Sequence, residues 1–181
     1  MACARAECRR NDHGDLRAAT TKQTKYDDGI IGIRLASVDR TIMTVTRRAT
    51  CACGKLSIAI NGDPNLVGAC ACTQCQRRTG SAFNVSAYFN KSQVVAIEGP
   101  HKTFQRSSDA GRNNELHFCP DCGSTLFWYS ERFPDAVGTA VGCFLDPAFP
   151  KPKVFVWAAH KMDWVQLPPD IPVYADQSIT R

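Results

Sequence analysis

The sequence predicts a mainly β protein with at most short helical turns. Eight segments of five to eight residues alternate in polarity or are rich in β-branched and aromatic residues, and turn-forming residues separate them. No segment longer than about ten residues keeps the 3.6-residue apolar period of a helix. At 181 residues the chain is long enough to bury a core without disulfides.

The expected strands follow one another from residue 55 to residue 158. In the first, "KLSIAI", Leu56, Ile58 and Ile60 fall on one face, and "NGDPN" then ends the strand. The others are "FNVSAYF", "SQVVAIEG", "HKTFQRS", "ELHFC", "STLFWYS", "GTAVGCF" and "KVFVWA", separated by turns such as "EGP", "ERFPD" and "DPAFPKP". A short helical turn is expected after Cys75, through "QRRTG".

The first 47 residues differ from the rest of the chain. They are polar and mixed in charge, so we expect a disordered or loosely attached leader before a domain of residues 48–181. Cys3 and Cys8 are interpreted as free thiols of this leader. Residues 1–50 carry ten Lys or Arg and six Asp or Glu, and the remainder carries twelve and eleven. The net charge of +5 therefore lies mostly in the leader, and nucleic acid is not an expected partner.

Ten cysteines raise the question of disulfides. The N-terminus has no signal-peptide pattern, and no apolar run approaches the length of a membrane span. We expect a cytoplasmic protein with no membrane partner, in which paired cysteines are more often metal ligands than disulfides. The sequence makes no prediction of oligomeric state.

Two short motifs, "CACG" and "CPDCG", predict a closed metal site. Each brings two thiolates to one side of a tight turn, here called a knuckle, and the following Gly can adopt a positive φ that points backbone N–H groups at sulfur. Together they supply four ligands for tetrahedral zinc: Cys51, Cys53, Cys119 and Cys122. A closed site of four thiolates has no vacant position, so its role would be structural.

A third motif, "CACTQC", supplies Cys70, Cys72 and Cys75 without a second knuckle. Zinc held by three protein ligands keeps one position open to water or substrate, which is typical of catalytic zinc. Two alternatives stay open. A fourth ligand could close the site, with His101, His117 and Cys143 as candidates, or the thiols could cluster without metal.

The order of "CACG", "CACTQCQRRTGS", "FCPDCGS", "VGCFLDP" and "HKMDWVQLPPDIPVY" resembles the glutathione-dependent formaldehyde-activating enzyme family, whose relatives include centromere protein V. The resemblance covers about residues 48–176. It implies a compact β fold called a β-tent, with structural zinc on the four knuckle cysteines and catalytic zinc on the three of "CACTQC". One departure is Ala71, where members of the family commonly have His.

The reaction that the resemblance implies is addition of the glutathione thiol to formaldehyde, which gives S-hydroxymethylglutathione. In reverse the enzyme would be a carbon–sulfur lyase. Glutathione carries two carboxylates, so its site needs cationic or N–H partners. The candidates near the cysteine motifs are Arg77, Arg78, Gly80, Ser81, Arg106 and Arg112. The rival hypothesis is a zinc-stabilised module that binds protein or nucleic acid without catalysis.

Overall fold

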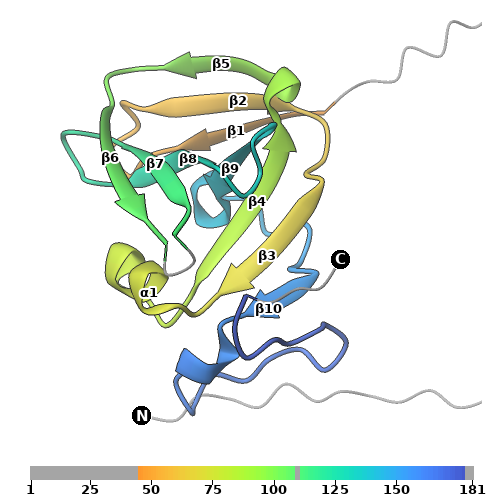
Figure 1. Ribbon diagram of the computed structural model, residues 1–181. Helices are drawn as coiled ribbons and strands as arrows, with labels where there is room; N and C mark the ends of the chain where they lie inside the picture. Colours follow the sequence, from red (N-terminus) through yellow and green to blue (C-terminus); the bar gives the residue numbers. More distant parts are fainter. Residues whose placement is uncertain (1–44, 109–110, 178–181) are drawn as a thin grey trace, which may run out of the picture. The chain divides into compact units, whose positions relative to one another are not determined.

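The computed structural model describes residues 45–108 and 111–177, all of which belong to one unit. Within it, β1 (Thr46–Thr50), β2 (Ser57–Asn61) and β5 (Val94–Glu98) form an antiparallel sheet in the order β1-β2-β5 (Figure 1). A second sheet has seven strands in the order β10-β3-β4-β9-β8-β7-β6. Its strands are β3 (Leu66–Cys70), β4 (Asn84–Asn90), β6 (Lys102–Ser107), β7 (Asn113–Phe118), β8 (Thr125–Ser130), β9 (Ala136–Ala140) and β10 (Val154–Val156).

Helical structure in the described residues is short. The α-helix α1 (Thr73–Thr79) follows β3. The 3-10 helices are η1 (Lys91–Gln93), η2 (Val141–Phe144) and η3 (Ala158–His160). The prediction of a mainly β fold with short helical turns is confirmed.

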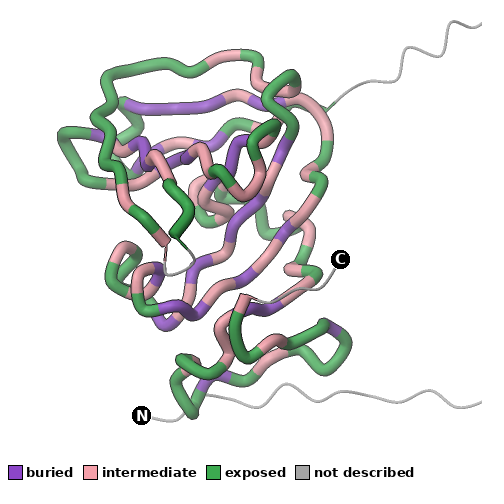
Figure 2. Tube along the Cα trace, viewed as in Figure 1, coloured by how far each residue is buried: buried purple, intermediate pink, exposed green. Residues whose placement is uncertain are grey.

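The main core lies between the two sheets because both contribute alternating apolar residues to it. Leu56, Ile58 and Ile60 are fully buried, as the alternation in "KLSIAI" predicted. Ala87 and Phe89 of β4 join them. Buried and half-buried residues alternate along β3 (Figure 2), so one of its faces is less covered than the other.

Each of the eight predicted segments contains a strand, three of them are shortened beside a 3-10 helix, and two further strands were missed. β9 ends at Ala140, and the segment from Val141 to Phe144 forms η2, so Cys143 lies in a 3-10 helix and not in a strand. β1 and β3 were not predicted. β3 reads "LVGAC", in which Gly and small residues weaken the local strand signal, and its pairing with β4 and β10 stabilises it instead.

The expected leader, with Cys3 and Cys8, falls almost entirely on residues 1–44, which lie outside the described residues. β1 begins at Thr46. No helix within residues 45–108 and 111–177 is both long enough and apolar enough to cross a membrane.

Candidate metal centre and pocket

The two knuckles bring four cysteines together. Cys51 and Cys53 follow β1, Cys119 and Cys122 follow β7, and the four Sγ atoms lie within 4.8 Å of one another. The Sγ of Cys53 is 3.5 Å from that of Cys51 and 3.6 Å from that of Cys119. Tetrahedral zinc with Zn–S bonds of about 2.3 Å places its sulfurs about 3.8 Å apart, so these residues fit the ion.

Each knuckle is closed by a glycine, as its motif predicted. Gly54 has a φ of 77° and Gly123 a φ of 73°, a region in which a side chain is strained. Their N–H groups donate to the carbonyl oxygens of Cys51 and Cys119, both at 2.9 Å. The N–H of Leu56 points at Cys51 Sγ, at 3.2 Å, which favours a thiolate there.

A second cluster forms where β3 passes into α1. Cys70 ends β3, Cys72 is the N-cap of α1, and Cys75 lies in its first turn, with the three Sγ atoms within 4.8 Å of one another. The N–H of Cys75 donates to Cys72 Sγ at 3.4 Å. Gly80, with a φ of 64°, ends the helix. This cluster could also hold a metal ion.

The three central thiols share negative charge unequally. Hydrogen bonds from Cys70 and Cys75 lower the pKa of Cys72 to about 2, and the same bond with Cys72 raises the pKa of Cys70. For Cys75 the hydrogen bond with Cys70 lowers the pKa, but the one with Cys72 and burial outweigh it and raise the pKa to about 11. A bound cation would favour deprotonation of all three thiols, as in a soft metal site.

The candidate fourth ligands lie elsewhere. His117 Nε2 is 2.9 Å from Glu115 Oε1, its ring stacks on Phe127, and His101 lies beside it, with ring centroids 5.1 Å apart. His117 is buried. Cys143 lines a hollow beside Cys51 and Cys53. Among the described residues, the group around Cys70 therefore contains three cysteines and no histidine. Ala71 is fully buried beside Phe155.

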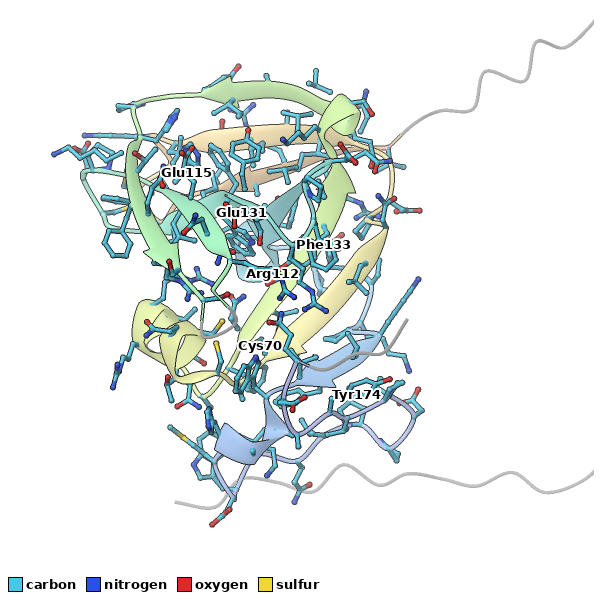
Figure 3. The ribbon with its side chains drawn as sticks, viewed as in Figure 1. Cys70, Arg112, Glu115, Glu131, Phe133 and Tyr174 are labelled. Atoms are coloured by element: carbon cyan, nitrogen blue, oxygen red, sulfur yellow. The ribbon has the colours of Figure 1, made fainter. Side chains whose placement is uncertain are left out.

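One face of the seven-stranded sheet forms a pocket over the central cysteines. Because side chains alternate, Leu66, Gly68 and Cys70 of β3 line it, and Asn84, Ser86 and Tyr88 of β4 stand opposite them in register. Val154 and Val156 of β10 continue the floor on one side, and Trp128, Ser130, Asn114, Leu116, Arg106 and Ser108 continue it on the other. Figure 3 labels Cys70, Arg112 and Phe133, which approach this pocket from three segments.

Four arginines line the pocket: Arg78, Arg106, Arg112 and Arg132. The guanidinium of Arg78 stacks over the Trp128 ring, 4.9 Å from its centroid. Burial lowers the pKa of Arg78, while the charge of Cys75 opposes that change. A stacked, half-buried guanidinium is less hydrated than a free one and is well suited to bind an anion.

The other predicted binding residues lie outside the pocket lining. Arg77 is exposed on α1, Gly80 caps the helix, and exposed Ser81 donates its N–H to Thr79 Oγ1 at 3.2 Å. Sequence reasoning missed Arg132 and the polar face of β4. The signal for that face was present, because "FNVSAYF" places Asn84, Ser86 and Tyr88 on one side.

Most of this domain matches a known protein family. A sequence model described as "Glutathione-dependent formaldehyde-activating enzyme" matches residues 46–160. The chain belongs to this family. The family match runs from β1 to η3 and includes both cysteine clusters and the four pocket arginines.

Individual relatives are distant. A curated protein of Halomonas elongata, whose description names the same family, is 24% identical over 124 residues, which cover 65% of this chain and 78% of that protein. A crystal structure of a Rhodobacter sphaeroides protein is 22% identical and covers 57% of this chain and 91% of that one. The TM-score between the two structures is 0.42.

Proposed function

We propose that this protein catalyses the reversible addition of the glutathione thiol to an aldehyde such as formaldehyde, as a carbon–sulfur lyase that forms and cleaves S-hydroxymethylglutathione. The observation that carries the proposal is a three-cysteine cluster at the floor of an arginine-lined pocket. The family supports glutathione and formaldehyde as substrates. A cytoplasmic location stays a prediction.

We propose two zinc ions per chain, a structural ion on the four knuckle cysteines and a catalytic ion on Cys70, Cys72 and Cys75. The donor chemistry supports both, since thiolates select soft metals. When bound at the three-cysteine site, zinc would supply a Lewis acid able to lower the pKa of a thiol or to polarise a carbonyl.

Arginines would orient the thiol substrate. Arg78, Arg106 and Arg112 line the pocket around the cysteine cluster and offer planar, charged donors to the two carboxylates of glutathione. Their positive charge also favours the substrate thiolate over the thiol. The case for binding is weaker for three other predicted residues, Arg77, Gly80 and Ser81, because they do not line the pocket.

Polar side chains of β4 would form hydrogen bonds with the oxygen of the aldehyde. In the addition, a sulfur–carbon bond forms, the carbonyl π bond breaks, and the thiol proton ends on the oxygen. Burial raises the pKa of Tyr88, although hydrogen bonds with Trp128 and Ser86 oppose the rise. Its hydroxyl therefore keeps its proton at neutral pH and can donate to that oxygen. Asn84 Nδ2 donates to Ser86 Oγ at 2.7 Å, which fixes this polar row.

The rival hypothesis, a zinc-built binding module, loses part of its basis. In a nucleic-acid-binding module, the basic residues Arg47 and Arg48 of β1 would be expected to contact the phosphate backbone. Arg47 pairs with Asp63 at 2.6 Å and Asp146 at 3.2 Å, and Arg48 pairs with Glu98 at 2.6 Å. Charges already paired within the domain contribute less to attraction of a phosphate backbone.

The test measures zinc per chain and turnover of glutathione with formaldehyde in the wild type, Cys70→Ser and the control Cys143→Ser. We expect two zinc ions to fall to one in Cys70→Ser, and turnover to fall by roughly 100-fold or more as several kcal/mol of charge stabilisation are lost. Cys143→Ser should match the wild type, since Cys143 belongs to neither cluster. One zinc ion in all three proteins, or full turnover by Cys70→Ser, would reject the proposal and favour a binding module.

A further inference from the structure

The pocket has an apolar side that begins at the central cysteine cluster. β10 runs parallel to β3 and pairs Val154 with Gly68 and Val156 with Cys70. Both valines line the pocket, whereas Phe155 between them packs into the second core cluster. One neighbour of Cys70 across the sheet is therefore Val156, and the other is the polar Asn84.

Gly68 leaves open space on this side. A Cβ built on Gly68 meets Val154 Cγ1 at 3.4 Å, an ordinary contact, and no other atom within 4 Å. Its φ lies outside the left-handed region, so the backbone does not require glycine. Because Gly68 has no side chain, the pocket has a recess between Leu66, Val154 and Cys70. Gly68 precedes Cys70 of the three-cysteine cluster by two residues.

Trp157 lines the same pocket and has a strained backbone conformation. It lines the pocket directly after Val156 and has a φ of 59°, which is unfavourable for a bulky residue. Its N–H donates to the Asp176 carbonyl at 3.2 Å, and its ring stacks on His160 with centroids 5.4 Å apart. Strain of this kind persists where the surroundings enforce it, and it concentrates at ligand sites.

Neither proposed substrate carries a large apolar group suited to this recess. Glutathione is polar and doubly anionic, which suits the arginine side of the pocket, and formaldehyde has a single carbon. We propose that the physiological adduct carries an apolar group of several carbons on its aldehyde-derived carbon, and that this group packs on Gly68, Val154 and Val156. The inference rests on the proposed thiol addition and narrows its substrate class to branched aliphatic or aromatic aldehydes.

The chemical step is unchanged by the larger group. The thiol S–H adds across the aldehyde C=O, a sulfur–carbon bond forms, and the proton passes to oxygen, giving a thiohemiacetal. No oxidant or reductant is needed. Apolar burial in the recess strengthens binding of the transition state and the adduct, since each buried methylene contributes favourably to transfer from water.

The experiment compares three aldehydes with glutathione by exchange NMR, each corrected for its uncatalysed rate. They are formaldehyde, cyclohexanecarbaldehyde and tetrahydropyran-4-carbaldehyde, which has the shape of the second with one ring oxygen. We expect kcat/KM to be highest for the cyclohexyl compound. The Gly68→Leu side chain would occupy the recess. In this variant, the ratio of kcat/KM for the cyclohexyl aldehyde to kcat/KM for formaldehyde should fall by about 10-fold or more, because the apolar pocket loses the space for the larger group.

Two further variants keep the test decisive if Gly68→Leu folds poorly. Val154→Ser should lower the ratio of kcat/KM for the cyclohexyl aldehyde to kcat/KM for the tetrahydropyran aldehyde. The control is Val95→Ser, at an exposed position on β5 outside the pocket, which should leave this ratio unchanged. Turnover of formaldehyde with no preference for the cyclohexyl compound would overturn the inference and leave the proposed function standing. No acceleration with any aldehyde would overturn both.

Discussion

At the scale of single residues, two neighbouring side chains of the same type can have different surroundings and therefore different roles. Arg77 and Arg78 are neighbours on α1, yet Arg77 is exposed and Arg78 lies half-buried over Trp128 in the pocket. The helix rotates successive residues by about 100°, so only one of the pair can face the sheet. The two arginines therefore form a matched pair for testing anion binding.

Arg78→Met should raise KM for glutathione by roughly 10- to 100-fold, because a charge-assisted hydrogen bond contributes about 1.5–3 kcal/mol. Steady-state kinetics at fixed aldehyde concentration measure this change. Arg77→Met should stay within about 2-fold of the wild type, as expected for an exposed surface position. Equal effects in the two variants would show that Arg78 has no special part in binding.

At the scale of elements, the sheet positions the Trp128 ring by letting it pack directly against a neighbouring strand. β8 and β9 pair Trp128 with Gly138, and a Cβ built on Gly138 would lie 2.1 Å from the indole Nε1. The indole lies directly against the β9 backbone there, with Tyr88 at its edge and Arg78 above. A glycine in the middle of a strand thus determines where the arginine stands.

Gly138→Ala should lower the free energy of unfolding by about 1–3 kcal/mol, because the indole must leave its place or strain the strand. Urea denaturation measures the change. The control is Gly142→Ala in η2, where a Cβ meets no atom within 4 Å and whose φ lies outside the left-handed region. A Gly138→Ala protein as stable as that control would contradict this account of the packing.

At the scale of the whole domain, the four knuckle cysteines join the two sheets. Cys51 and Cys53 extend from the three-stranded sheet, and Cys119 and Cys122 from the seven-stranded sheet. A metal ion at this point would fasten together the elements that enclose the main core. The three-cysteine cluster lies within one β3–α1 connection and would not link sheets.

Cys122→Ser should therefore unfold the domain or greatly lower its Tm. Structural zinc contributes about 10–16 kcal/mol in small zinc domains, comparable with a total stability of about 5–15 kcal/mol. Cys122 is exposed, so the loss would come from the metal site and not from core packing. Thermal unfolding with and without a chelator measures it. Cys72→Ser should unfold near the wild-type temperature, and an equally large loss there would contradict the division of roles.

The sequence by itself determined the β class, most strands, both cysteine clusters and the knuckle turns. These features are local: alternation defines a strand face, and a Gly after the second cysteine defines a turn within five residues. Only the tertiary structure decided that Arg78 but not Arg77 faces the pocket, that Arg132 joins it, and that Cys143 lies beside the knuckles. It also placed Val154 and Val156 of β10 beside Gly68 and Cys70. Strand order depends on burial between segments far apart in the chain, and alternation along one strand does not specify its neighbour.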